Sequence, residues 1–342
     1  MGLSKCGMCG VPRQVILTNR WREDGIIENK PVGTREVVFL ERELVVEVFQ
    51  GIQDKLGIPI DRIVMEAKRK DALLYADGVL TGVLGILRWK PLRRSAYRFL
   101  INQSAAIGLG HIELLDYRPG SRLFGRADPV YHRALFTGDV AGGFESIERK
   151  RAGVITREED GWFILELRTT EEAGEEDRLI PVESKAVKTK AEYERCGSCG
   201  VPREISRFRW VKEKGQIIDT ATGEWVFVIG RGGIGAVIRE LREELGEEIP
   251  RLVAEHTRRF YRRLMEKQRG EAFNDLSFMG PRGMGVPVPV NIADADPALG
   301  VSVFNPFNPP MVAGMVAAVS GAGQDAFDWE EEREGVMAVR MS

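Results

Sequence analysis

Hydrophobic and polar positions follow the same order of elements twice along the chain. Apolar runs rich in β-branched and aromatic residues predict strands at 35–40 (REVVFL) and 224–229 (EWVFVI). Helical spacing of Ile52, Leu56, Ile60, Ile63 and Val64 predicts a helix after the first of these strands. A second helix and a β-hairpin follow, then a helix rich in small residues (134–147 or 311–323) and a last strand (161–168 or 335–341). This order predicts an α+β fold.

The dipeptides Asp128-Pro129 and Asn305-Pro306 precede the two helices rich in small residues. Asp and Asn accept hydrogen bonds from free N–H groups at a helix start, and Pro is tolerated in the first turn. We therefore expect each dipeptide to begin the helix that follows it.

The chain is a tandem duplication. CGMCGVPR at 6–13 returns as CGSCGVPR at 196–203, and Trp21 then matches Trp210. The similarity continues from 54–70 to 243–259, and from 106–129 to 280–306. Between these two stretches the second copy is about fifteen residues shorter. We expect one unit at 1–168, a second, shorter and diverged unit at 196–342, and a charged linker at 169–195 that is poor in apolar residues.

Composition excludes several classes of partner. The chain has 342 residues and a net charge of −2, so no global field favours nucleic acid or an anionic membrane. Asn, Gly and Pro interrupt the longest uncharged run, 297–323, and the start lacks a signal-peptide pattern. We expect a soluble, cytoplasmic protein with no membrane span and no nucleic-acid partner.

The four cysteines predict one metal site. A C-x-x-C pair supplies two of the four ligands of a closed structural zinc site, so we expect Cys6, Cys9, Cys196 and Cys199 to form one tetrahedral site. Closing a loop of about 190 residues costs on the order of 5 kcal/mol, less than the roughly 10–16 kcal/mol that structural zinc contributes in small peptides. The alternatives are iron in a rubredoxin-type site and a redox pair. Val-Pro-Arg after both pairs disfavours the redox pair, which usually stands at a helix start.

No catalytic constellation emerges. His111, His132 and His256 are scattered, and Glu66–Arg69 and Glu255–Arg258 have ordinary helical pair spacing. The basic stretches RWKPLRRSAYR and RRFYRRLMEKQR predict helices with one solvated face, with docking to RNA or to an acidic protein as the alternative. An enzyme is therefore the less favoured class.

Three glycines have the spacing of a dinucleotide-binding loop. Gly230, Gly232 and Gly235 lie between a predicted strand and a predicted helix. The first unit has no such glycines, and no βαβ pattern surrounds the second. We expect a permissive loop, with anion binding at the helix start as the alternative.

The later elements resemble a known family of small-ligand-binding domains. IGLGHIELLDY, ADPVYHRALFTGDVAGGFESI and VITREEDGWFILELR look like parts of the 4-vinyl-reductase-type domain, also called the hydrocarbon-binding domain and related in fold to TRAPP subunits. The resemblance implies binding of an apolar or aromatic small molecule and a fused homodimer with an internal pseudo-twofold axis. Some members hold zinc through cysteines late in the domain, where this chain has none.

The resemblance also implies an apolar pocket. Its candidate lining consists of helical apolar residues that would equally fill a plain core: Leu80, Val83, Leu84, Leu87, Leu135, Phe136 and Phe144 in the first unit, and Phe304, Phe307, Met311 and Met315 in the second. We expect non-catalytic binding of a small apolar or aromatic molecule, with a structural metal site made of the four cysteines. The alternatives are an accessory or assembly subunit of a larger enzyme complex and a reductase acting on a tetrapyrrole-like substrate.

Overall fold

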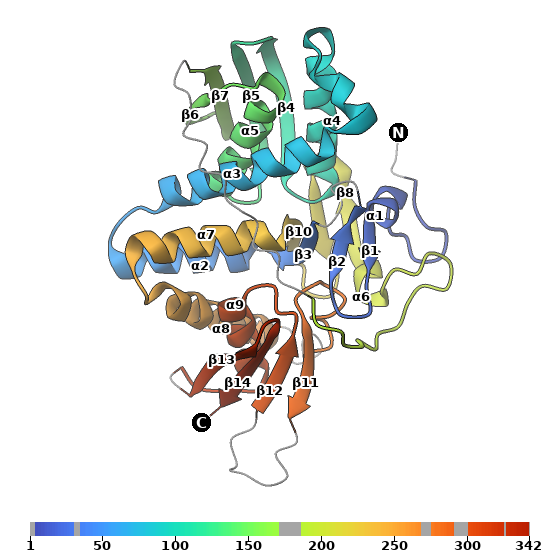
Figure 1. Cartoon of the computed structure of the whole chain (residues 1–342), viewed down its shortest axis with the longest axis vertical. Helices are drawn as coiled ribbons and strands as arrows, with labels where there is room; N and C mark the ends of the chain where they lie inside the picture. The colour runs from blue at the N-terminus through green and yellow to red at the C-terminus, as the bar shows by residue number, and fades with distance from the viewer. Residues whose placement is uncertain are drawn as a thin grey trace.

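The computed structural model describes residues 4–30, 35–170, 186–267, 275–290, 300–324 and 326–341 (Figure 1). Of the predicted linker, residues 171–185 lie outside this description. The elements before the linker are α1 (Arg13–Thr18), β1 (Asn19–Trp21), β2 (Ile27–Asn29), β3 (Glu36–Glu41), α2 (Arg42–Leu56), α3 (Asp61–Val79), the 3-10 helices η2 (Gly82–Arg88) and η3 (Lys90–Leu92), α4 (Arg93–Ala106), β4 (Gly110–Arg118), β5 (Arg122–Val130), α5 (Arg133–Glu148), β6 (Ala152–Glu159) and β7 (Trp162–Thr169). After it come α6 (Arg203–Ser206), β8 (Phe208–Val211), η4 (Lys212–Lys214), β9 (Gln216–Asp219), β10 (Trp225–Gly230), α7 (Arg231–Leu245), α8 (Ile249–Lys267), β11 (Val286–Val290), β12 (Gly300–Phe304), α9 (Pro309–Val319), β13 (Phe327–Arg333) and β14 (Val336–Met341).

The described strands form three antiparallel sheets, which confirms the predicted α+β class. The two smaller sheets have the same strand order, β4-β5-β7-β6 and β11-β12-β14-β13, one in each half of the chain. They lie at opposite ends of the molecule (Figure 1). No described helix has the length and hydrophobicity that crossing a bilayer requires.

The third sheet joins the two halves. Its order is β1-β2-β3-β10-β9-β8, so three strands come from each half and β3 pairs with β10 at the centre. In this antiparallel pair Phe39 faces Val228, the residue at the same position of the sequence repeat. Equivalent residues that face each other in antiparallel strands are related by a local twofold axis.

Reciprocal hydrogen bonds repeat this relation outside the sheet. The N–H of Phe39 donates to the carbonyl of Arg282 at 2.9 Å, and the N–H of Val228 donates to the carbonyl of Ile107 at 2.8 Å. The indole N–H of Trp21 donates to Pro281 O, while that of Trp210 donates to Ala106 O. Each half therefore holds the loop before the small sheet of the other half.

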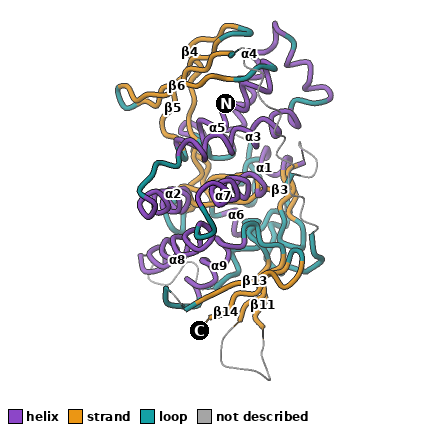
Figure 2. The backbone as a smooth tube through the Cα atoms, turned by 60° about the vertical axis from the view of Figure 1, so that its left-hand side comes forward, coloured by secondary structure: helices purple, strands orange, loops and turns teal. Residues whose placement is uncertain are grey.

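The long helices also cross between the halves. Helix α2 packs against α8, and α7 packs against α3. Figure 2 shows α2 and α7 as a middle layer, with α3 and α5 towards one end and α8 and α9 towards the other. One contiguous hydrophobic cluster contains residues of all these helices, among them Val48, Ile238, Val253 and Phe136. The halves therefore share a core.

Local sequence explains where the helices begin and end. The predicted helix through Ile52 and Val64 is two helices, because α2 ends at Leu56, Gly57 adopts a φ of 68° and Pro59 follows. The predicted cap at Asp128-Pro129 is wrong, since those residues lie in β5 and His132 caps α5. The cap of α9 is Asn308 rather than Asn305.

Small residues in α5 and α9 allow helix backbones to touch. A Cβ atom at Gly142 would lie less than 3.0 Å from the carbonyl oxygen of Arg69 in α3. In the other half, a Cβ atom at Gly314 would come equally close to the carbonyl oxygen of Ala254 in α8. A substituent at either position would push the paired helices apart, which explains the small-residue pattern of both segments.

A buried ion network ties the second half to the central sheet. Arg282 is fully buried and binds Glu41 of β3, Asp219 of β9 and Glu204 of α6. Burial opposes the charge on Arg282, but these three carboxylates outweigh it and raise the pKa of Arg282 above its ordinary value. The network therefore depends on every charge having its partner.

Replacing Arg282 tests this dependence. The Arg282→Met variant should lose about 3–5 kcal/mol of unfolding free energy, because the buried carboxylate of Glu41 loses Arg282 and that of Asp219 keeps only Arg207. Urea unfolding of the variant measures the loss. Arg340→Met, which removes an exposed arginine, should change stability by less than about 0.5 kcal/mol. Equal effects of the two substitutions would contradict the assignment.

Candidate metal centre

The two C-x-x-C segments fold into the same loop. The N–H of Cys6 donates to Val11 O at 2.9 Å, and the N–H of Gly10 donates back to Cys6 O at 3.0 Å. Cys196, Gly200 and Val201 make the same two bonds, both at 2.8 Å. Gly10 and Gly200 both have a φ of 74°, the left-handed region that glycine enters without strain. Each loop therefore turns tightly enough to aim both of its sulfurs in one direction.

The loops meet and form one cluster of four sulfurs rather than two separate knuckles. The Sγ atoms of Cys6 and Cys196 lie 3.9 Å apart, and those of Cys9 and Cys199 lie 3.5 Å apart. All four lie within 4.8 Å of one another. Each short distance joins equivalent residues of the repeat, so the twofold relation of β3 and β10 extends to the cluster.

The cluster stands on a second hydrophobic core that is shared by the halves. Val11, Trp21 and Phe39 of the first half pack there with Val201, Trp210 and Val228 of the second. Cys9 and Cys199 also pack against this core. The position of the sulfurs is therefore set by buried side chains between the loops and the central sheet.

The thiols of Cys6 and Cys196, the two buried cysteines, have lowered pKa values. Hydrogen bonds from the backbone N–H groups of Cys9 and Met8 lower the pKa of the Cys6 thiol from 9.0 to about 6. Backbone N–H groups of Ser198 and Cys199 lower the pKa of Cys196 in the same way. Burial instead raises the pKa of Cys9 to about 12 and also raises that of Cys199. The thiols of Cys9 and Cys199 therefore need a nearby cation to ionise near neutral pH.

The donor set fits a tetrahedral metal ion. With zinc–sulfur bonds of about 2.3 Å, the sulfurs of a tetrahedral site lie about 3.8 Å apart. The two short distances, 3.9 and 3.5 Å, lie close to this value. Four thiolates at such distances repel one another strongly unless a cation lies among them. The cluster is therefore consistent with an ion such as zinc or iron.

A small apolar cavity lies in the first half, about 70 Å³ in volume, between α4, α5, β4 and β5. Two predicted pocket residues, Phe136 and Phe144, line it together with residues that were not predicted, among them Tyr97, Leu100, Ile112 and Val140. Asp139, Ser104 and Glu113 are its polar lining residues.

The other predicted pocket residues do not line this cavity. Leu80, Leu135, Phe307, Met311 and Met315 are buried in the shared core. Leu84 is exposed, Leu87 packs on the core and Phe304 is half-buried, while the side chain of Val83 lies outside the described part. The predicted lining named no residue of α4, although the apolar residues Tyr97, Leu100 and Ile101 of that helix have helical spacing.

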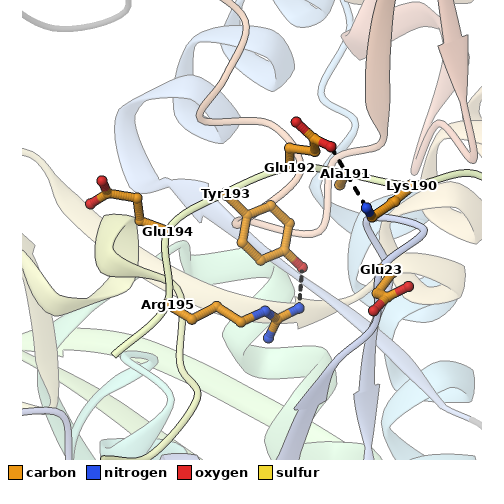
Figure 3. Close-up of a pocket in the computed structure, with 7 residues that line it drawn as sticks. All are labelled: Glu23, Lys190, Ala191, Glu192, Tyr193, Glu194 and Arg195. Carbon is orange, nitrogen blue, oxygen red and sulfur yellow. Dashed lines mark hydrogen bonds and ion pairs between the residues drawn. The ribbon is translucent and has the colours of Figure 1, made fainter. Parts of the chain in front are cut away.

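An open groove of about 470 Å³ lies beside the second metal loop (Figure 3). It is lined by Glu23 and by residues 190–195, which immediately precede Cys196. Its polar groups bind one another: the Tyr193 hydroxyl donates to Arg22 O at 2.7 Å, and Arg195 donates to the Tyr193 hydroxyl at 3.1 Å. Along this groove, hydrogen bonds attach residues 190–195 to the first half.

The glycine-rich start of α7 is filled by side chains of the first half. A Cβ atom at Gly233 would lie less than 3.0 Å from a carboxylate oxygen of Asp71, and one at Gly230 would lie 2.6 Å from the Arg35 guanidinium. Burial opposes the charge of Asp71, but Arg35 and Lys68 outweigh it and lower the pKa of Asp71. The ion pair thus explains the glycines at 230 and 233, whereas Gly232 and Gly235, the other two members of the G-x-G-x-x-G spacing, face open space.

The remaining candidates have ordinary structural contacts. His132 caps α5, and burial lowers its pKa to about 4. His256 lies against Gly51 of α2, and Arg69 binds both Glu66 and Glu145.

Cysteine variants distinguish one shared site from two separate ones. Cys6→Ser and Cys196→Ser should each abolish stoichiometric metal binding, because each removes a ligand from the same cluster. Elemental analysis of the purified variants measures metal per chain, with one ion expected for the unaltered chain. Met8→Ala, an exposed substitution in the same loop, should keep the metal. Retention of half the metal in either cysteine variant would contradict a shared site.

A matched pair of glycine variants tests the interpretation of α7. Gly233→Ala should lower stability by about 1–3 kcal/mol because its Cβ meets the Asp71 carboxylate. Gly235→Ala faces open space and should raise stability by about 0.5–1 kcal/mol through helix propensity. Thermal or urea unfolding measures both. A gain for Gly233→Ala as large as that for Gly235→Ala would overturn the close approach of Asp71.

Comparisons with known proteins return nothing. No family model matches the chain, and no curated protein or solved structure is significantly similar to it. What can be said of its function therefore rests on the cysteine cluster, the cavity and the surfaces around them.

Proposed function

We propose that this chain is a non-catalytic binding protein of the hydrocarbon-binding type, folded as an internal pseudo-dimer. In this proposal the first half holds a small apolar or aromatic molecule in the cavity below α4. The four cysteines hold one structural zinc or iron ion that fastens the two halves together.

The cavity is the observation that carries the ligand-binding part of the proposal. Its wall combines aromatic and aliphatic side chains with only a few polar groups, as in sites that bind apolar molecules. At about 70 Å³ it is smaller than the roughly 300–1,000 Å³ of pockets for drug-sized ligands. A ligand larger than a small fragment therefore requires one wall to move.

Helix α4 is the wall best suited to move. It buries only Ala96, Tyr97 and Ala106, whereas α5 on the opposite side is buried along most of its length. Few buried contacts mean a low free energy of local opening. We infer that a ligand enters by displacing the later part of α4, beyond Arg93 and Tyr97, which bind Glu148 of α5.

The cysteine cluster supports a structural metal. All four ligand positions of a tetrahedral ion are supplied by cysteines, so no position is left for water or substrate, as catalytic zinc requires. In this position the metal links the start of one half to the start of the other.

Filling the cavity tests the proposed ligand site. Gly143 of α5 lines the cavity. A Cβ atom added at Gly143 would have Leu100 as its nearest neighbour, at 3.5 Å. Gly143→Leu should weaken binding of the uncharged fluorescent probe N-phenyl-1-naphthylamine at least about tenfold, because the leucine occupies the space of the probe. Fluorescence titration measures the affinity.

The control is Gly235→Leu, the same change on a helix position that faces open space. It should leave probe affinity unchanged. Absence of probe binding to the unaltered chain, or equal affinities for the two variants, would contradict the proposal. As an independent test, native mass spectrometry of protein purified gently from its own source should show a retained apolar molecule.

A further inference from the structure

The segment around η2, η3 and α4 has one sign of charge. From 78 to 112 the sequence contains Arg88, Lys90, Arg93, Arg94 and Arg98 but no Asp or Glu, although the whole chain has a net charge of −2. This segment accounts for most of the length by which the first copy exceeds the second. It is therefore a local basic feature that the overall charge conceals.

Large apolar side chains are exposed at the same place. Leu84, Ile86 and Trp89 are 38%, 61% and 65% exposed. They lie on consecutive tight turns, since the N–H of Trp89 donates to Ile86 O at 3.0 Å and that of Leu92 donates to Trp89 O at 2.7 Å. Single exposed apolar residues are common, but three within six positions form a patch that calls for a partner.

The basic residues divide into an inner and an outer group. Arg88 binds Asp77, and Arg93 binds Glu148 at 2.6 Å, so these two fix the segment to α3 and α5. Lys90, Arg94 and Arg98 are exposed, and among the described residues none of them has an acidic partner. Arg94 and Arg98 are four residues apart on α4, so they share a face of that helix.

The segment also stands at an extremity of the molecule. Figure 1 shows α4 at the upper end of the long axis, away from the C-terminal sheet. A surface at the end of an elongated molecule can contact a flat partner without collision from the rest of the chain.

We propose that Leu84, Ile86 and Trp89, flanked by Lys90, Arg94 and Arg98, form a docking surface for the headgroup region of an anionic lipid bilayer. Tryptophan with aliphatic side chains enters the headgroup region, and lysine and arginine beside them bind anionic lipids. The aliphatic residues disfavour nucleic acid, for which aromatic stacking would be expected. Docking would place α4, the movable wall of the cavity, against the membrane.

Vesicle flotation with the full chain tests the proposal. The chain should float with phosphatidylcholine vesicles that contain phosphatidylglycerol, and only weakly with phosphatidylcholine alone. Replacing both exposed arginines, Arg94→Gln with Arg98→Gln, should lower the partition coefficient about thirtyfold, at about 1 kcal/mol per basic residue. Ile86→Asp should lower it at least about tenfold, because a charge replaces an apolar contact.

Matched variants elsewhere on the surface serve as controls. Ile155→Asp changes an isoleucine that is 53% exposed on β6, and Arg209→Gln changes an exposed arginine on β8. Both should float like the unaltered chain, and all variants should unfold at the same temperature. Failure to bind anionic vesicles, equal binding to neutral vesicles, or an arginine effect without an Ile86 effect would overturn the proposal. Arginine-dependent binding of single-stranded RNA with no vesicle binding would replace it.

Discussion

The antiparallel pairing of β3 with β10 is the constraint on which the rest of the structure depends. Phe39 faces its own repeat equivalent, Val228, and this single register relates the two halves by a twofold axis. The reciprocal tryptophan bonds to Pro281 and Ala106 follow from the same relation. So does the cysteine cluster, because an axis that relates the two metal loops brings each C-x-x-C pair opposite its equivalent. A shift of one residue in this pairing would turn one strand over relative to the other and exchange the side chains that it presents to the two hydrophobic cores.

The two halves differ in their buried charges and in the segment that contains η2, η3 and α4. In the second half, Arg282 is buried among carboxylates. In the first half, Asp71 binds Arg35 and Lys68 beside the start of α7. Both sets of ion pairs stabilise the junction between the halves. Helix α4 belongs to the first half, as do the apolar cavity and the exposed basic patch beside it, and the described part of the second half has no helix between α8 and β11. The twofold relation thus accounts for the arrangement of the shared sheet and helices. The proposed ligand binding and membrane docking depend on the η2–α4 segment.

Much of this could be predicted from the sequence, because a repeat reveals which residues are equivalent. The α+β class and the meeting of all four cysteines followed from it. The crossing of α2 and α7 to the other half did not, since periodicity shows that a helix has an apolar face but not which helix covers it. Arg282 gave no signal either, because a buried arginine looks like a surface arginine until its carboxylates are placed. The prediction of one continuous helix through Gly57, Ile58 and Pro59 was wrong, although Gly57 and Pro59 are residues that end helices.

The central claim is that the halves form one fold around one shared metal ion. Native mass spectrometry of the two halves, produced as separate fragments by a break in the charged linker, tests it most directly. The account predicts a complex of one copy of each fragment with a single metal ion, because β3 lacks its partner strand and each cysteine pair lacks two ligands in either fragment alone. Two fragments that stay apart, each folded and each with its own metal ion, would contradict it.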